Sequence, residues 1–106
     1  MEAYGLDDVT ARQQAAGRPY LEFIRSGALS VGLYVLPAEG VDGQQPHAED
    51  EVYHVVEGRA RMTVGTETVD VRAGSVVYVA AGVPHRFHDI AEELRILVFF
   101  APPETG

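Results

Sequence analysis

The chain has 106 residues, the length of a single domain, and it can bury roughly two-thirds of its unfolded surface without covalent staples. It contains no cysteine and no lysine, which excludes thiolate metal sites, cysteine nucleophiles and Schiff-base chemistry on lysine. The formal net charge of −8 argues against nucleic acid and anionic membrane surfaces as partners. Without a signal peptide or a long apolar run, the sequence indicates a soluble cytoplasmic protein with no membrane contact.

The first part of the chain, residues 1–18, is expected to form an N-terminal arm or short helix. Asp7 or Asp8 is suited to cap a helical turn over residues 9–16, and Gly17 is suited to end it. The apolar face of this segment is thin, so we expect it to rest on the surface of a domain that spans residues 19–103.

From Tyr20 onward the apolar residues follow a period of two, which is typical of strands. Glycine- and proline-containing turns separate the runs, and the Pro102-Pro103 pair is expected to leave a frayed tail. No helical pattern stands between the strands, so the fold class is predicted to be all-β, a single-domain antiparallel jelly-roll barrel. The eight expected strands are 20–25, 28–36, 50–57, 59–64, 67–72, 75–79, 85–89 and 94–100.

Two histidines and one carboxylate form a candidate metal site. His47 and Glu51 stand four residues apart where a loop enters a strand, and His85 follows a Gly-Val-Pro turn far downstream. Two imidazoles and one carboxylate with open positions are typical of non-haem iron sites, although Mn, Zn, Ni, Co and Cu accept the same donors. Gln45 is expected to add an amide oxygen as a fourth ligand, or only to hydrogen-bond a bound water.

The spacing of these residues resembles the two motifs of the cupin superfamily. His47, Glu51 and Gly58 follow the first motif, with Gln45 where that motif usually opens with a histidine. The second motif is resembled by Gly74, Ala80, Gly82, His85 and Asp89, with alanine and aspartate in place of the usual proline and asparagine. The resemblance implies a small single-domain cupin that binds a divalent metal ion through His47, Glu51 and His85.

The remaining histidines and aromatic residues receive other roles. His54 and His88 lie three residues from Glu51 and His85, an odd offset that turns a strand side chain to the opposite face. Three residues are candidates to line the pocket as well as the core: Tyr34, Met62 and Phe87. The full set expected in the core is Tyr34, Tyr53, Met62, Tyr78, Phe87, Phe99 and Phe100.

The function predicted from these features is metal-dependent chemistry on a small organic molecule, of a dioxygenase or other oxidoreductase type. Glu49 or a tyrosine is a candidate acid–base, but the sequence does not identify the catalytic residues. The alternatives are a non-catalytic module that binds metal or a small ligand, and a metal-dependent isomerase. Residues 94–100 are apolar on both faces, which predicts a homodimer that covers the outer face.

Overall fold

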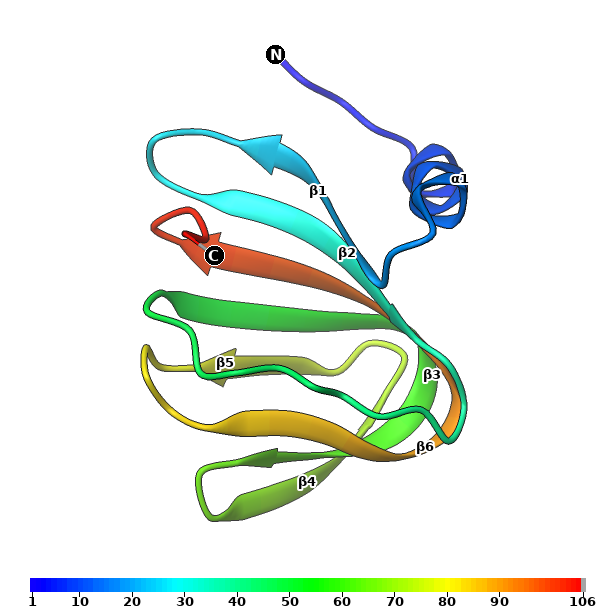
Figure 1. Ribbon diagram of the computed structural model, residues 1–106, viewed down its shortest axis with the longest axis vertical. Coiled ribbons are helices and arrows are strands. Elements are labelled where there is room, and N and C mark those ends of the chain that lie inside the picture. Colours follow the sequence, from blue (N-terminus) through cyan, green and yellow to red (C-terminus); the bar gives the residue numbers. More distant parts are fainter. Residues whose placement is uncertain (106) are drawn as a thin grey trace.

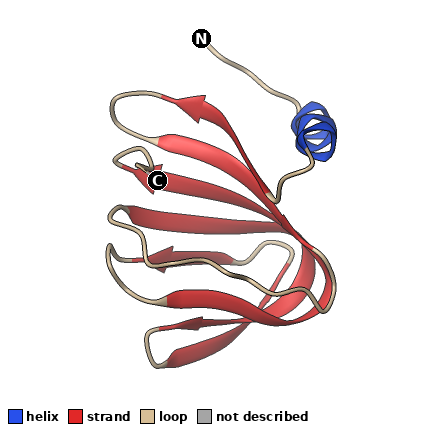
Figure 2. Ribbon diagram, viewed as in Figure 1, coloured by secondary structure: helices blue, strands red, loops and turns tan. Residues whose placement is uncertain are grey.

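The computed structural model describes residues 1–105 and shows an all-β fold with one helix near the N-terminus (Figure 2). The jelly-roll expectation is confirmed, since the strands pair only in antiparallel fashion within the described residues. The elements in order are α1 (Leu6–Ala16), β1 (Tyr20–Arg25), β2 (Ser30–Leu36), β3 (Asp50–Val64), β4 (Glu67–Arg72), β5 (Val76–Val79) and β6 (His85–Ala101).

The two long strands, β3 and β6, hold the barrel together. Strand order is β1-β2-β6-β3-β4, with β5 paired to β3 off this path. The first half of β3 pairs with the end of β6 and with β5, whereas its second half pairs with the start of β6 and with β4. Both long strands curve, so the sheet folds over itself and encloses the core (Figure 1).

The structure corrects the expected number of strands, because two pairs of predicted strands are continuous. The tight turn predicted at Gly58 is instead a bulge inside β3, and the register with β6 shifts between Val55 and Arg61. Gly58 has φ +98, and a Cβ added there would lie 2.2 Å from the carbonyl oxygen of Glu93. A glycine in a strand therefore marks a bend with close backbone approach here, which is a common meaning of such a residue.

Helix α1 lies outside the barrel beside β1 (Figure 1). Its N-cap is Gly5, and the expected caps Asp7 and Asp8 lie in the first turn instead, where their charge favours the helix dipole. Gly17 ends the helix in a left-handed conformation, as predicted. Within residues 1–105, no helix has the length and apolar character needed to cross a membrane.

The interior of the folded sheet is filled by side chains from alternate residues of the strands, which point inward. Tyr53, Met62, Phe87, Leu94 and Ile96 are almost completely buried there. The ring of Phe87 packs edge-on against Tyr53, with centroids 5.2 Å apart. This contact places Tyr53 between the apolar core and the polar residues described next. The whole cluster comprises Leu36, Tyr53, Val55, Ala60, Met62, Val71, Val79, Phe87, Ile90, Leu94, Ile96, Val98 and Phe100.

Candidate metal centre

The structure brings His47, Glu51 and His85 together in one cluster, with one potential ligand atom from each residue within 4.8 Å of the others. Glu51 is the second residue of β3 and His85 is the first residue of β6. Both side chains point inward, with 1% of the Glu51 side chain and 0% of the His85 side chain exposed. His47 reaches the cluster from the loop before β3. Oε1 of Glu51 lies 2.6 Å from Nδ1 of His47 and 3.5 Å from Nε2 of His85.

The ring of His85 is oriented by the turn that precedes it. Its Nδ1 lies 2.9 Å from the carbonyl oxygen of Val83, and a carbonyl can only accept, so Nδ1 carries the hydrogen. The other nitrogen, Nε2, therefore faces the cluster, 2.8 Å from the hydroxyl oxygen of Tyr53. An N–H held by a backbone carbonyl is a usual arrangement behind a metal-ligating histidine.

Gln44 and Asp42 fix the hydroxyl of Tyr53 from the other side. Nε2 of Gln44 donates to Oδ2 of Asp42 at 2.8 Å, which leaves the amide Oε1 facing the Tyr53 hydroxyl at 3.0 Å. Asp42 also accepts hydrogen bonds from the backbone N–H of Phe87 and the hydroxyl of Tyr34. The buried Asp42 carboxylate thus ties the loop before β3 to the inner side of β6.

The hydrogen-bond arrangement around Tyr53 leaves His85 one partner short. A phenol has a single hydrogen, so Tyr53 cannot donate both to Gln44 and to His85. When that hydrogen is directed to Gln44, Nε2 of His85 needs a proton or a metal ion to bind its lone pair. A cation bound to Nε2 of His85 satisfies every polar group in the hydrogen-bond chain that runs from Asp42 through Gln44 and Tyr53 to His85.

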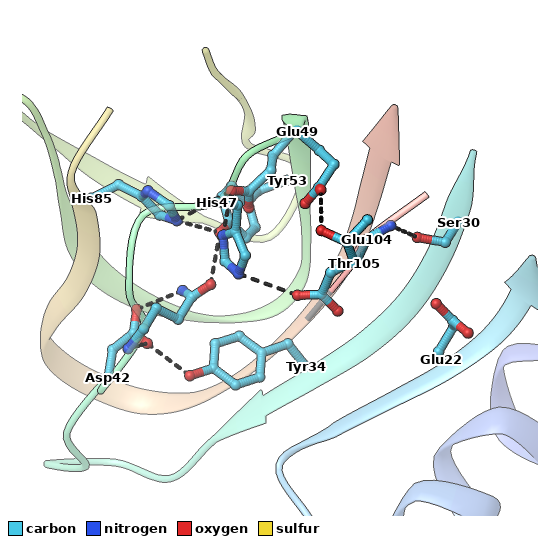
Figure 3. A network of polar contacts seen from close by, with 12 residues as sticks. Glu22, Ser30, Tyr34, Asp42, His47, Glu49, Tyr53, His85, Glu104 and Thr105 are labelled. Atoms are coloured by element: carbon cyan, nitrogen blue, oxygen red, sulfur yellow. Dashed lines mark hydrogen bonds and ion pairs between the residues drawn. The ribbon is translucent and has the colours of Figure 1, made fainter. Parts of the chain in front are cut away.

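His47 lies between two carboxylates, from Glu51 on one side and Glu104 on the other (Figure 3). Its Nδ1 faces Glu51 and its Nε2 lies 3.2 Å from Oε2 of Glu104. A neutral imidazole carries only one N–H, so it can donate to only one of these carboxylates. The second nitrogen again requires a proton or a metal ion.

A third observation concerns Glu51 itself. Its Oε2 is buried and has no hydrogen-bond partner among the described residues. An orphaned carboxylate oxygen in the interior is costly unless a cation compensates it. With two imidazole nitrogens directed at the same carboxylate, the donor set therefore fits a divalent metal ion.

Burial favours the neutral phenol form of the tyrosines around the cluster. Burial, helped by the charge of Glu51, raises the pKa of Tyr53 far above its ordinary value. Burial and the bond to Asp42 raise the pKa of Tyr34 in the same direction. Burial also raises the pKa of Tyr20, whose buried hydroxyl has no partner among the described residues.

A small pocket of about 160 Å³ opens beside His47. Tyr34 lines it, whereas Met62 and Phe87 lie in the core and not in its wall. Gln45 is exposed, and its neighbour Gln44 points into the pocket in its place. The lining consists of Tyr20, Tyr34, Gln44, His47, Val98, Phe100 and Glu104.

The other histidines lie apart from the cluster. His54 stands between the buried Tyr53 and Val55 in β3, and so faces the outer side of the sheet. His88 is within hydrogen-bond distance of Thr63 Oγ1, at 2.7 Å, and of Asp89, at 2.9 Å. Neither residue belongs to the group that could hold an ion.

The C-terminal tail is a part of the pocket that the sequence did not reveal. Instead of fraying after Pro103, it turns back, and the backbone N–H of Glu104 donates to the buried Ser30 hydroxyl at 3.0 Å. Arg25 donates to the Glu104 carbonyl, and the Thr105 hydroxyl donates to the buried Glu49 carboxylate at 2.8 Å. Burial raises the pKa of the Glu104 carboxyl, an effect that His47 opposes. No local sequence signal marks this contact, because its partners are far away along the chain.

Comparison with known proteins finds a relative in sequence and solved structures with a similar fold. A protein of Streptomyces coelicolor, described as uncharacterized, is 56% identical over 105 residues, which cover 99% of this chain and 100% of the relative. A Bacillus halodurans crystal structure superimposes with a TM-score of 0.83 at 19% identity, covering 99% of this chain and 83% of the other. An RmlC-like cupin from Methanocaldococcus jannaschii, with a double-stranded β-helix fold, gives a TM-score of 0.70 at 19% identity, covering 78% of each chain.

The family model named Cupin domain matches residues 32–100, a range that contains β3 to β5, most of β2 and β6, and all three cluster residues. This match spans more than half of the chain and agrees with both motifs and with the observed barrel. The protein belongs to the cupin domain family.

Proposed function

We propose that this protein holds a divalent metal ion through His47, Glu51 and His85 and uses it in chemistry on a small organic molecule. The observation that carries the proposal is the shared carboxylate: Oε1 of Glu51 faces one nitrogen of each histidine, while its Oε2 is buried without a partner. Fe, Mn, Zn, Ni, Co and Cu are all compatible with this donor set. The amide oxygen of Gln44 faces Tyr53 at 3.0 Å and Gln44 lines the pocket, so we assign to Gln44 the role beside the ion that the sequence analysis expects for Gln45.

The reaction that we propose is an oxygen-dependent oxidation, of the dioxygenase type, by a homodimer in the cytoplasm. A divalent ion bound by two neutral imidazoles and one carboxylate supplies a Lewis acid of net charge about +1 with open coordination positions. The protein contributes the pocket beside His47, where Val98 and Phe100 exclude water from one side. Tyr34 and Gln44 supply polar contacts that orient a small ligand there.

A binding module without turnover is the second candidate, and one observation favours it over an isomerase. An isomerase needs a proton-transfer group that is poised near neutral pH. The pKa values of the pocket tyrosines Tyr20 and Tyr34 are shifted upward, away from neutrality. Glu49 is bound to Thr105, and Glu104, whose pKa burial raises, is paired with His47. The pocket chemistry therefore supports binding, or chemistry at the ion, better than proton shuttling by these side chains.

Metal analysis of protein purified without added metal tests the proposal first. We expect about one divalent ion per chain, lost in a Glu51→Gln variant because the shared carboxylate is removed. Oxygen uptake by the loaded protein with a panel of diketones and thiols then distinguishes the two candidates. Uptake supports an oxygenase, and bound metal without any turnover supports the binding module. Wild-type protein that takes up no metal after equilibration would refute both.

A further inference from the structure

In the C-terminal tail, the side-chain carboxylate of Glu104 contacts one of the proposed metal ligands. Oε2 of Glu104 lies 3.2 Å from Nε2 of His47, the nitrogen on the side of the ring opposite to Glu51. Four-fifths of the Glu104 side chain is buried, and it forms part of the pocket wall. Figure 3 shows the imidazole of His47 between the His85 side of the cluster and this carboxylate.

The position of Glu104 is held by contacts on both sides of it. Its N–H donates to the hydroxyl of Ser30, which is completely buried, and its carbonyl accepts from Arg25. The following residue, Thr105, donates to Glu49, which is also buried. These three hydrogen bonds anchor residues 104 and 105 to β1, β2 and the loop before β3. The anchored backbone directs the Glu104 side chain toward His47.

The two imidazoles then show the same arrangement. His85 directs Nδ1–H to the carbonyl oxygen of Val83 and turns Nε2 toward Glu51. His47 directs Nε2 to Glu104 and turns Nδ1 toward Glu51. In each ring the nitrogen far from the cluster lies near an oxygen, 2.9 Å from the Val83 carbonyl in His85 and 3.2 Å from Glu104 in His47, and the near nitrogen faces Glu51. Such acceptors fix the tautomer of a ligating histidine and raise its basicity.

We propose that Glu104 is a positioning residue of the metal centre, which holds the hydrogen of His47 on Nε2 so that Nδ1 is free to bind the ion. The tail then contributes a positioning residue to the site, although it lies outside the region matched by the family model. The inference rests on the metal site proposed above, and it names the nitrogen of His47 that binds.

The test compares Glu104→Gln and Glu104→Ala with Glu92→Gln, which removes the same charge from an exposed position paired with Arg59. Zinc affinity is measured by competition with a chelator, and the histidine tautomers are read from long-range proton–nitrogen NMR spectra with and without zinc. We expect both Glu104 variants to bind zinc about tenfold more weakly or worse, the usual loss when an outer acceptor is removed. We expect Glu92→Gln to match wild type.

The NMR spectra separate positioning from simple stabilisation of the fold. In wild-type protein His47 should carry its hydrogen on Nε2 and bind zinc through Nδ1, and both Glu104 variants should lose this single tautomer while the signals of His88 stay unchanged. Glu104→Asp, which keeps a carboxylate, should recover part of the affinity. Unchanged or tighter zinc binding in Glu104→Ala, or a wild-type His47 bound through Nε2, would overturn the proposal. If wild-type protein binds no zinc, the metal site itself fails, and the metal-free tautomer still reports on the contact between His47 and Glu104.

Discussion

The amide of Gln44 determines the direction in which the hydroxyl of Tyr53 donates its hydrogen. Because Nε2 of Gln44 is bound to Asp42, only its oxygen faces the phenol, at 3.0 Å. The Tyr53 hydrogen is drawn toward Gln44 and away from His85, which leaves Nε2 of His85 available. This relationship links a loop residue to the electron pair of a proposed metal ligand without direct contact between the two.

Replacing Gln44 by alanine should therefore weaken metal binding, although Gln44 is not itself one of the three ligands. Without the amide oxygen, the Tyr53 hydroxyl donates to Nε2 of His85 and competes with the ion. We expect a loss of affinity of about tenfold, in the range measured for outer residues of metal sites. The measurement is zinc titration against a chelator. Gln45→Ala is the matched control and should bind like wild type, since Gln45 is exposed; the opposite order would show that the loop sits differently in the loaded protein.

The four histidines should separate into two classes when each is changed to alanine. His47→Ala and His85→Ala should lose the bound ion and lower the melting temperature of metal-loaded protein, because the ion binds the native state preferentially. His54→Ala and His88→Ala should retain it, because both residues lie outside the cluster. Metal per chain after identical dialysis provides the measurement. Retention by His85→Ala together with loss by His88→Ala would disprove the assignment.

Metal occupancy should fall on acidification. An imidazole coordinates only in its neutral form, and an ordinary histidine titrates near pH 6.5, so protons displace the ion as the pH decreases through this region. Dialysis at a series of pH values, followed by metal analysis and circular dichroism, separates release from unfolding. Full occupancy of folded protein well below about pH 5 would be inconsistent with histidine ligation.

At alkaline pH the buried tyrosines should make the fold less stable. The pKa values of Tyr20, Tyr34 and Tyr53 are raised above the ordinary value of 10.0, so above that pH the unfolded chain binds fewer protons than the folded one. Stability is therefore complete below about pH 10 and decreases as the pH rises beyond it. Denaturant unfolding between about pH 8 and pH 11 measures this. Tyr53→Phe should cost about 1 kcal/mol at neutral pH and reduce the alkaline loss; an equal loss in both proteins would exclude Tyr53 as a source.

A homodimer should form through the outer face of the sheet around β3. Phe99 and Tyr78 flank Val52 on neighbouring strands, and they are 38% and 60% exposed. Val76, two residues from Tyr78 on the same strand face, is 66% exposed. Helix α1 covers β1 and β2 and leaves this region open. Sedimentation should show a dimer that Tyr78→Glu disrupts, with Val41→Glu on an exposed loop as control. A monomer at tens of micromolar wild-type protein would rule the interface out.

The sequence predicted the barrel and the three clustered residues because their signals are local or follow a fixed spacing. Alternation with a period of two assigned Glu51 and His85 to the inner face, and the same parity sent His54 outward. The loop before β3 has no period, so only the spacing of the first motif selected Gln45 over Gln44. Only the hydrogen bonds from Gln44 to Asp42 and from Tyr53 to Gln44 make that distinction.

The remaining differences come from contacts between distant segments. Gly58 was interpreted as a turn because glycine serves both turns and bulges, and the approach of Glu93 decides for the bulge. The tail was expected to fray after two prolines, yet Ser30, Arg25 and Glu49 bind it. These partners lie more than fifty residues earlier in the chain, beyond the reach of any local pattern.

The curvature of the long β3–β6 ladder has a consequence for how the metal centre is assembled. Glu51 pairs with Phe100 and His85 pairs with Val64, so the two proposed ligands belong to opposite ends of the same ladder. They meet at 3.5 Å because the ladder doubles back near Gly58, where only a residue without a Cβ fits against Glu93. The distance between Glu51 and His85 therefore depends on the curvature of the sheet. Gly58, at the far end of the barrel, thus influences the distance between the two ligands that an ion must bridge.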